Sequence, residues 1–149
     1  MTKSVTRSKV FLTEDYIKRI PSKDTLNRAS FPYAQVEDPT TLKAFEQFVK
    51  VTNLSFQHAC LQDKHLEGLA APYVRTLNLN YTQVTKDGIL SLRTLPELKV
   101  LHLKGCASFS KKEIEAAKKD AKRFLDEVYT QKYGLKALFK KGYELLFPK

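Results

Sequence analysis

The side chains that could do chemistry in this chain are few and widely spaced. His58, His65 and His102 are the only histidines, and no two of them have the spacing that places two metal ligands on one helix face. The chain has no Cys-x-x-Cys, no His-Glu-x-x-His and no glycine-rich phosphate loop. We therefore expect no catalytic, cofactor-binding or metal-binding residues, and a protein that is not an enzyme.

The two cysteines, Cys60 and Cys106, are predicted to be free thiols. The N-terminal residues contain no apolar secretory signal, which favours a reducing, intracellular compartment. Cys106 lies where a small side chain would pack into the turn after a strand, so we expect it to fill the core and not to act as a nucleophile. Cys60, one residue beyond the matching position, is expected to be partly exposed.

Apolar residues recur at a regular spacing over three stretches of the chain. Every member of the second stretch follows its counterpart in the first at the same interval. The third stretch follows at an interval one residue longer, and a single inserted residue near Ala107 lengthens it once more. The three sets are Val51, Leu54, Phe56, Ala59, Leu61, Leu66 and Leu69; Val74, Leu77, Leu79, Thr82, Val84, Ile89 and Leu92; and Leu98, Leu101, Leu103, Cys106, Phe109, Ile114 and Ala117. Agreement at this many positions indicates internal repeats.

Within one copy, the spacing predicts a strand, a turn and a helix. Leu77 and Leu79 alternate as on a strand, whereas Ile89 and Leu92 are three residues apart, as on one helix face. A unit of about 24 residues cannot bury its own apolar face, so neighbouring units must stack. We therefore predict an α/β fold, a short solenoid of about three repeats with parallel strands on the concave side and helices on the convex side. The residues expected to be buried on neighbouring strands are Leu77, Leu79, Leu101 and Leu103.

Two of these stretches resemble the strand and turn pattern of leucine-rich repeats. They are Val74-Arg-Thr-Leu-Asn-Leu-Asn-Tyr-Thr82 and Leu98-Lys-Val-Leu-His-Leu-Lys-Gly-Cys106. The stretch Thr82-Gln-Val-Thr-Lys-Asp-Gly-Ile89 is similar to the cysteine-containing subtype found in F-box partners and in the ATP synthase subunit s (coupling factor B) group. The resemblance covers roughly residues 40–120 and implies the fold, but unrelated activities share this scaffold. The first repeat departs from the pattern at Ala59, where the family prefers Cys, Thr or Asn.

Helices are predicted to close both ends of the repeats. Asp38-Pro39-Thr40 before an apolar helix face predicts a capping helix, and Ser110 with Glu113 forms a capping box for one long helix that ends at Gly134. The chain then divides into a basic N-terminal extension (1–37), the repeats with their capping helix (38–117) and a basic helical C-terminal extension (118–149). The first extension has a weak helix signal at 13–20 and is expected to order on a partner.

Two surfaces are candidate docking sites for another protein. The strands should present a polar concave face, which could bind a protein or could simply be a solvated sheet face. The last segment carries apolar residues beyond those needed to cover three repeats. The residues predicted for the concave face are Asn53, Ser55, Gln57, Thr76, Asn78, Asn80, His102 and Lys104. Those predicted for the docking tail are Leu138, Phe139, Lys140, Lys141, Leu145, Leu146 and Phe147.

The charge distribution favours an interaction protein. The net charge is +10 at pH 7, and most of the excess lies in residues 1–35 and 110–149. Such ends suit acidic protein surfaces, RNA or anionic lipid, although a basic surface can also serve solubility alone. No stretch is apolar enough to cross a membrane, so any membrane contact is expected to be peripheral.

We expect a non-catalytic scaffold for protein–protein interaction, an accessory or structural subunit of a large multiprotein complex. The similarity to the subunit s group and the basic N-terminus point to mitochondria. One alternative is a ribonucleoprotein or mitoribosomal accessory protein that binds RNA through its basic ends. Another is an F-box-type substrate-recognition adaptor, although no F-box sequence precedes the repeats.

Overall fold

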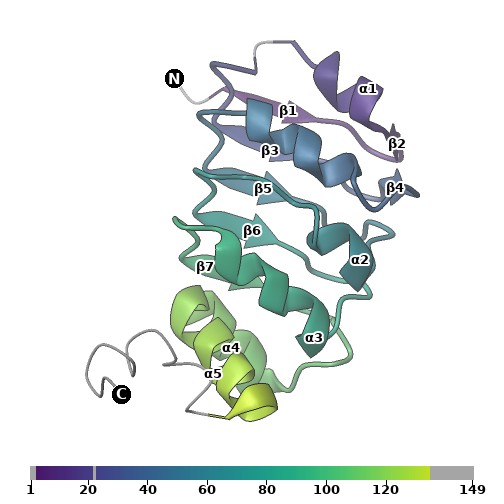
Figure 1. Cartoon of the computed structure of the whole chain (residues 1–149). Coiled ribbons are helices and arrows are strands. Elements are labelled where there is room, and N and C mark those ends of the chain that lie inside the picture. The colour runs from purple at the N-terminus through teal and green to yellow at the C-terminus, as the bar shows by residue number, and fades with distance from the viewer. Residues whose placement is uncertain (1–2, 22, 135–149) are drawn as a thin grey trace, which may run out of the picture.

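The protein has a mixed α/β fold built on a parallel sheet of five strands. A computed structural model describes residues 3–21 and 23–134 of the 149-residue chain. The strands lie side by side in the order in which they occur along the chain (Figure 1). They are β1 (Ser4–Thr6), β3 (Arg28–Ser30), β5 (Asn53–Ser55), β6 (Thr76–Asn78) and β7 (Val100–His102). A second sheet pairs β2 (Phe11–Leu12) with β4 (Gln35–Val36), also in parallel.

Most of the helical segments follow the strands and form a second layer on one side of the sheet, while the last two, α4 (Lys111–Lys119) and α5 (Ala121–Tyr133), lie at its end beyond β7 (Figure 1). In chain order the helical segments are α1 (Glu14–Lys18), the 3-10 helix η1 (Thr41–Gln47), α2 (Asp63–Leu66), α3 (Lys86–Ile89) with its 3-10 continuation η2 (Leu90–Thr94), α4 and α5. Neighbouring segments pack against one another: α1 against η1, η1 against α2, and α2 against α3.

The register of the strands follows the spacing of the apolar residues in the sequence. Leu54 pairs with Leu77, and Leu77 pairs with Leu101. Successive residues of a strand point to opposite faces, so these central leucines enter the core between sheet and helices. The four leucines predicted to be buried are all inaccessible to solvent, which confirms that part of the prediction: Leu77, Leu79, Leu101 and Leu103.

The sheet extends further towards the N-terminus than the sequence analysis predicted. β3 pairs with β5 at Arg28 and Asn53, and β1 pairs with β3 at Ser4 and Arg28. The separation in sequence between these paired residues continues the spacing predicted for the repeats. The sheet therefore has five strands, whereas the sequence analysis predicted about three repeats. The leucine pattern fails here because Val5 and Ala29 occupy the central strand positions. The boundary predicted after residue 37 therefore falls within one continuous sheet.

The segment predicted as an N-terminal capping helix lies inside the row of helices instead. η1 packs against α1 on one side and α2 on the other. Its Phe45 ring is fully buried, 5.5 Å from both Phe31, next to β3, and Phe56, next to β5. The helix was expected to close the N-terminal end, but α1 and β1 extend both layers beyond it.

Backbone hydrogen bonds link the starts of all five strands. The N–H groups of Asn27, Thr52, Arg75 and Lys99 donate to the carbonyls of Lys3, Asn27, Thr52 and Arg75, respectively, at 2.8–2.9 Å. The same bond occurs once more, from Ala121 N–H to the Lys99 carbonyl at 2.9 Å. The chain thus reaches the place where a sixth strand would begin, but α5 starts there.

Two helices, α4 and α5, occupy residues 111–133, where the sequence analysis predicted one. The capping box is confirmed, since Ser110 Oγ accepts from Glu113 N–H and Glu113 Oε1 accepts from Ser110 N–H. The helix breaks at Asp120. The extended backbone of Asp120 (φ −155°) lets the Ala121 N–H reach the Lys99 carbonyl, and its carboxylate caps the Arg123 N–H.

α4 packs on β7 and α5 on η2, so the pair covers the last strand. α5 ends before Gly134, as predicted. The predicted docking tail lies outside the described residues.

Asp63 fixes the distance between two neighbouring helices. Its carboxylate accepts from Thr85 N–H at 2.8 Å and from Thr85 Oγ1 at 2.5 Å, which joins the start of α2 to the start of α3. Gly88 follows in α3 and lies against the same carboxylate, because a Cβ atom built on Gly88 would overlap Asp63 Oδ1. Only a residue without a side chain allows this approach.

His65 is a buried polar side chain in the helix layer. Its Nδ1 accepts from Gln62 N–H at 2.9 Å, while its Nε2 is without a hydrogen-bond partner among the described residues. Burial is the main cause that lowers the pKa of His65 below its ordinary value of 6.5, and the nearby carbonyls of Glu37 and Val36 oppose it. The folded protein therefore favours the neutral imidazole.

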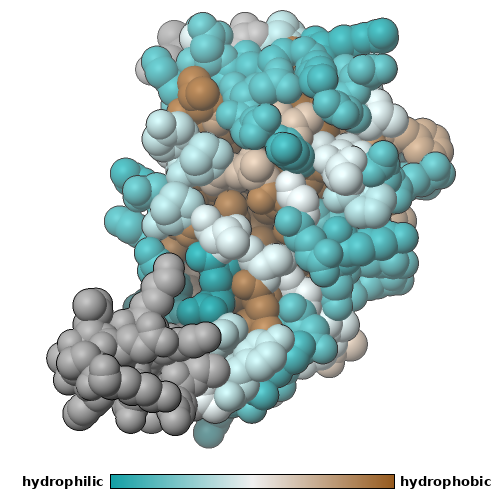
Figure 2. All heavy atoms as spheres, viewed as in Figure 1, coloured by the Kyte–Doolittle hydropathy of each residue, from teal (hydrophilic) through white to brown (hydrophobic). Residues whose placement is uncertain are grey.

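Hydrophilic residues cover much of the surface seen in Figure 2, with hydrophobic residues in patches among them. Ion pairs of opposite charge connect helices, such as Lys86 with Glu113 at 2.9 Å and Lys132 with Asp87 at 2.9 Å. The helix layer thus neutralises part of its own charge.

We predict that Gly88→Ala destabilises the protein by about 1–3 kcal/mol, because the new methyl group collides with Asp63. Without the collision, alanine would stabilise a helix relative to glycine, so the sign of the change is diagnostic. Urea unfolding measures it. In an Asp63→Ala background the same change should cost less, because the carboxyl atoms that it meets are gone, and strictly additive costs would contradict the contact.

We predict that the stability of the protein falls as the pH is lowered from about 7.5 to 5.5. The unfolded chain takes up protons near the ordinary histidine pKa of 6.5, whereas burial keeps His65 and His102 neutral to lower pH in the folded chain. Thermal melts across this range should show a smaller pH dependence in His65→Gln. An unchanged dependence would mean that His65 titrates alike in the folded and unfolded chains.

Candidate functional site

The face of the sheet that points away from the helices is the candidate functional site. On each of the strands β5, β6 and β7, the two residues that flank the buried one are half-buried on this open face. A groove of about 380 Å³ crosses it. The polar side chains that line the groove are Ser4, Thr6, Arg28, Ser30, Asn53, Ser55, Thr76, Asn78 and His102.

The structure brings together most of the residues predicted for this face. Five of the eight line the groove: Asn53, Ser55, Thr76, Asn78 and His102. The other three follow the strand ends: Gln57, Asn80 and Lys104. Sequence analysis missed the contributions of β1 and β3, because their strands lack the leucine pattern: Ser4, Thr6, Arg28 and Ser30.

Hydrogen bonds hold the amide side chains of the open face in place. Asn78 Oδ1 accepts from Asn80 N–H at 2.9 Å, and Asn80 Oδ1 accepts from Lys104 N–H at 2.8 Å. Asn78 Nδ2 also approaches Gln57 Oε1 at 3.5 Å. These bonds order the polar groups before any partner arrives, which lowers the entropic cost of binding.

A stack of three rings lies in the turns that follow the strands. The rings of Tyr33 and His58 are 4.7 Å apart, those of His58 and Tyr81 are 4.4 Å apart, and each pair is within 4° of parallel. All three residues adopt positive φ near 60°. Tyr33 and Tyr81 remain 49% and 42% exposed, so their edges and hydroxyl groups are available at the surface beside the groove.

Gly105 occupies the next position of the same row. Its φ is +76°, and a Cβ atom there would overlap Cδ1 of Tyr81. Tyr81 therefore packs directly against the Gly105 backbone at the end of the stack. The sequence analysis did not single out this row, although Tyr33, His58, Tyr81 and Gly105 recur at nearly the same spacing as the apolar residues.

The two cysteines lie where the sequence analysis expected them. Cys106 is buried, and its thiol donates to the Leu79 carbonyl at 3.2 Å. Thr82 occupies the matching position one unit earlier and donates to the same carbonyl at 2.7 Å. Cys60 is exposed. Cys106 thus satisfies backbone groups inside a turn.

The three histidines lie in different parts of the molecule. His58 belongs to the ring stack, His65 to the buried helix layer, and His102 to β7 on the open face. Across residues 3–21 and 23–134, no group of three or more His, Cys, Asp or Glu side chains is placed to hold a metal ion.

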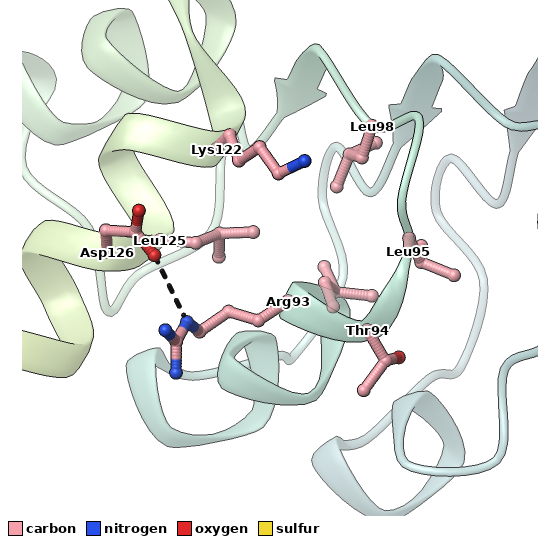
Figure 3. Close-up of a pocket in the computed structure, with 8 residues that line it drawn as sticks. Arg93, Thr94, Leu95, Leu98, Lys122, Leu125 and Asp126 are labelled. Atoms are coloured by element: carbon pink, nitrogen blue, oxygen red, sulfur yellow. Dashed lines mark hydrogen bonds and ion pairs between the residues drawn. The ribbon is translucent and has the colours of Figure 1, made fainter. Parts of the chain in front are cut away.

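A second groove lies between η2 and α5 (Figure 3). Its leucines belong to the core, and its rim carries the ion pair of Arg93 with Asp126 at 3.3 Å. Arg93 also lies 4.0 Å from the centre of the Tyr129 ring, and Lys122 Nζ donates to the Pro96 carbonyl at 3.2 Å. These contacts hold α5 against η2, so this groove is a seam between two packed helices.

Comparison of the chain with known protein families and with curated proteins gives no match. None of the helices in the described part of the chain is long and apolar enough to span a membrane.

We predict that Gly105→Ala displaces the Tyr81 ring and destabilises the protein by about 1–3 kcal/mol, through both its positive φ and the collision with the ring. Gly134→Ala is a matched control, because Gly134 also has positive φ (87°) and a Cβ atom there would have no neighbour within 4 Å. NMR ring-current shifts of the His58 protons would report the stack. Equal costs for both variants, with unchanged His58 shifts, would contradict the proposed contact.

Proposed function

We propose that the protein is a non-catalytic docking protein of the leucine-rich repeat type, which binds a partner protein on the open face of its sheet. The repeat assignment is supported by five parallel strands that lie in chain order and follow one another at a nearly constant interval in the sequence. Further support comes from the helices, which follow the strands on one side, and from the bonds that link the strand starts. On this assignment the open face is the concave side of a short solenoid.

The observation that carries the docking function is the preorganised polar surface of the open face. Its amides are fixed by hydrogen bonds, and its hydroxyl and amide groups line one continuous groove across the five strands. Exposed tyrosine edges lie beside it, and tyrosine is enriched where proteins bind one another. A partner could therefore exchange hydrogen bonds with this surface without reordering it.

RNA is the alternative partner, because the protein is basic. Base recognition by aromatic residues uses free ring faces. Both faces of His58 are covered by tyrosine rings, and Tyr81 has His58 on one side and the Gly105 backbone against it. His58 and Tyr81 are therefore better suited to edge contacts with a protein than to stacking with bases.

The partner is proposed to belong to a large assembly, in which this protein is an accessory subunit. The resemblance to the subunit s group directs the search to mitochondria. The test compares tagged full-length protein with two variants by native size fractionation of cell extracts. Thr76→Trp fills the groove on β6, whereas Lys64→Trp adds the same type of side chain at an exposed position of α2.

We predict that wild type and Lys64→Trp migrate in one large particle that resists ribonuclease, and that Thr76→Trp migrates at the size of the free protein. Equal melting temperatures of the purified variants would show that Thr76→Trp still folds. A particle that collapses on ribonuclease would favour the RNA alternative. A particle that retains Thr76→Trp would place the docking surface elsewhere on the chain.

A further inference from the structure

The segments of the chain that contain the strands of the main sheet carry charge of one sign only. Each strand, taken with the residue before it and the turn after it, forms one of five segments: 3–9, 27–33, 52–58, 75–81 and 99–105. No aspartate or glutamate occurs in any of them. Their basic residues, all exposed, are Lys3, Arg7, Lys9, Arg28, Arg75, Lys99 and Lys104. Every acidic residue of the described chain lies in the connections between these segments or in the helices after the last one.

These cations are not neutralised within the described part of the chain. The ion pairs there involve residues of the helical segments, as in Lys18 with Glu14 or Lys86 with Glu113. None includes a residue of the five strand segments. The positive charge of the strand segments is therefore not balanced by ion pairs among the described residues.

One of these cations, Arg28 in β3, lines the groove itself, and the others precede or follow the strands whose residues line it. Arg75 and Lys99 precede two adjacent strands and are joined by a backbone hydrogen bond of 2.8 Å. Lys104 follows β7, and its N–H is bound by Asn80. Hydroxyl and amide groups of Asn53, Ser55, Thr76 and Asn78 line the same groove.

α4, which packs on β7, contributes a further cation near His102. Burial, and then the charge of Lys118 in α4, lower the pKa of His102. Lys118 therefore acts electrostatically on the edge of the groove where β7 lies. An acidic group bound there would meet positive charge from both the sheet and α4.

We propose that the partner segment recognised by the open face is an extended, acidic polypeptide. This inference rests on the docking function proposed above. Asparagine amides and serine and threonine hydroxyls can donate to carboxylates and to peptide carbonyls, and the surrounding lysines and arginines supply charge complementarity. Five strands about 4.8 Å apart span about 19 Å, which about six residues of extended chain would cover.

The experiment measures binding of a fluorescent peptide of about ten residues, alternating glutamate and serine, to the purified full-length chain at low salt. A glutamine–serine peptide and a single-stranded RNA of similar length are the comparison probes. Arg28→Glu/Lys104→Glu reverses charge in the groove and at the end of β7, where Asn80 holds the Lys104 backbone. Lys43→Glu/Lys64→Glu reverses the same charge at exposed positions of η1 and α2, so both variants have the same net charge.

We expect wild type to bind the acidic peptide and not the glutamine peptide. The face variant should raise the Kd by about tenfold or more, whereas the helix variant should stay within about twofold. Equal weakening in both variants would mean that only the overall charge attracts the peptide, and would overturn the proposal. Tighter binding of RNA, lost in the face variant, would overturn it in favour of a nucleic acid.

The acidic-partner proposal and the docking function can fail separately. If wild type does not bind the acidic peptide while Thr76→Trp still removes the protein from its particle, the partner is not acidic but the docking surface stands. If Thr76→Trp also has no effect on the particle, the docking function itself is overturned.

Discussion

Burial of one row of apolar side chains between the sheet and the helices determines the rest of this structure. The strands and most of the helical segments are short, and none of these short elements is stable alone. Leu54, Leu77 and Leu101 must therefore pair across neighbouring strands so that the adjacent elements cover them. A register shift by a single position would expose this row and bury the polar one.

The polar open face is a consequence of that register. Residues that alternate with the buried ones are directed to the other side of the sheet, where the described helices do not lie. Acidic residues occur only outside the strand segments. Among the described residues they pair with lysines and arginines of the helical segments, and none pairs with a cation of the strand segments. The same geometry brings Tyr33, His58 and Tyr81 into one stack, because equivalent turns repeat at the spacing between strands.

The two edges of the sheet differ. At β7 the series of backbone hydrogen bonds between strand starts continues once more, from the Ala121 N–H to the Lys99 carbonyl, and α4 and α5 cover the core at this edge. At the other edge β1 has β3 as its only neighbour in the described sheet, and its central Val5 is only partly buried. Phe31, Phe45 and Phe56 compensate on this side, since their rings fill the space between the layers where Ala29 replaces a leucine.

The sequence by itself determined the units that contain paired leucines, the α/β class, the parallel pairing, five of the groove residues and the capping box at Ser110. All of these follow from local periodicity or from contacts between near neighbours in the chain. Only the tertiary structure revealed the strands at Val5 and Ala29, the break at Asp120 and the ring stack. Near Ala29, phenylalanine rings fill the space that a leucine would occupy. The helix break at Asp120 allows a hydrogen bond to the Lys99 carbonyl at the start of the preceding strand. Such contacts depend on which segments lie side by side in space, and a residue's local pattern does not carry that information.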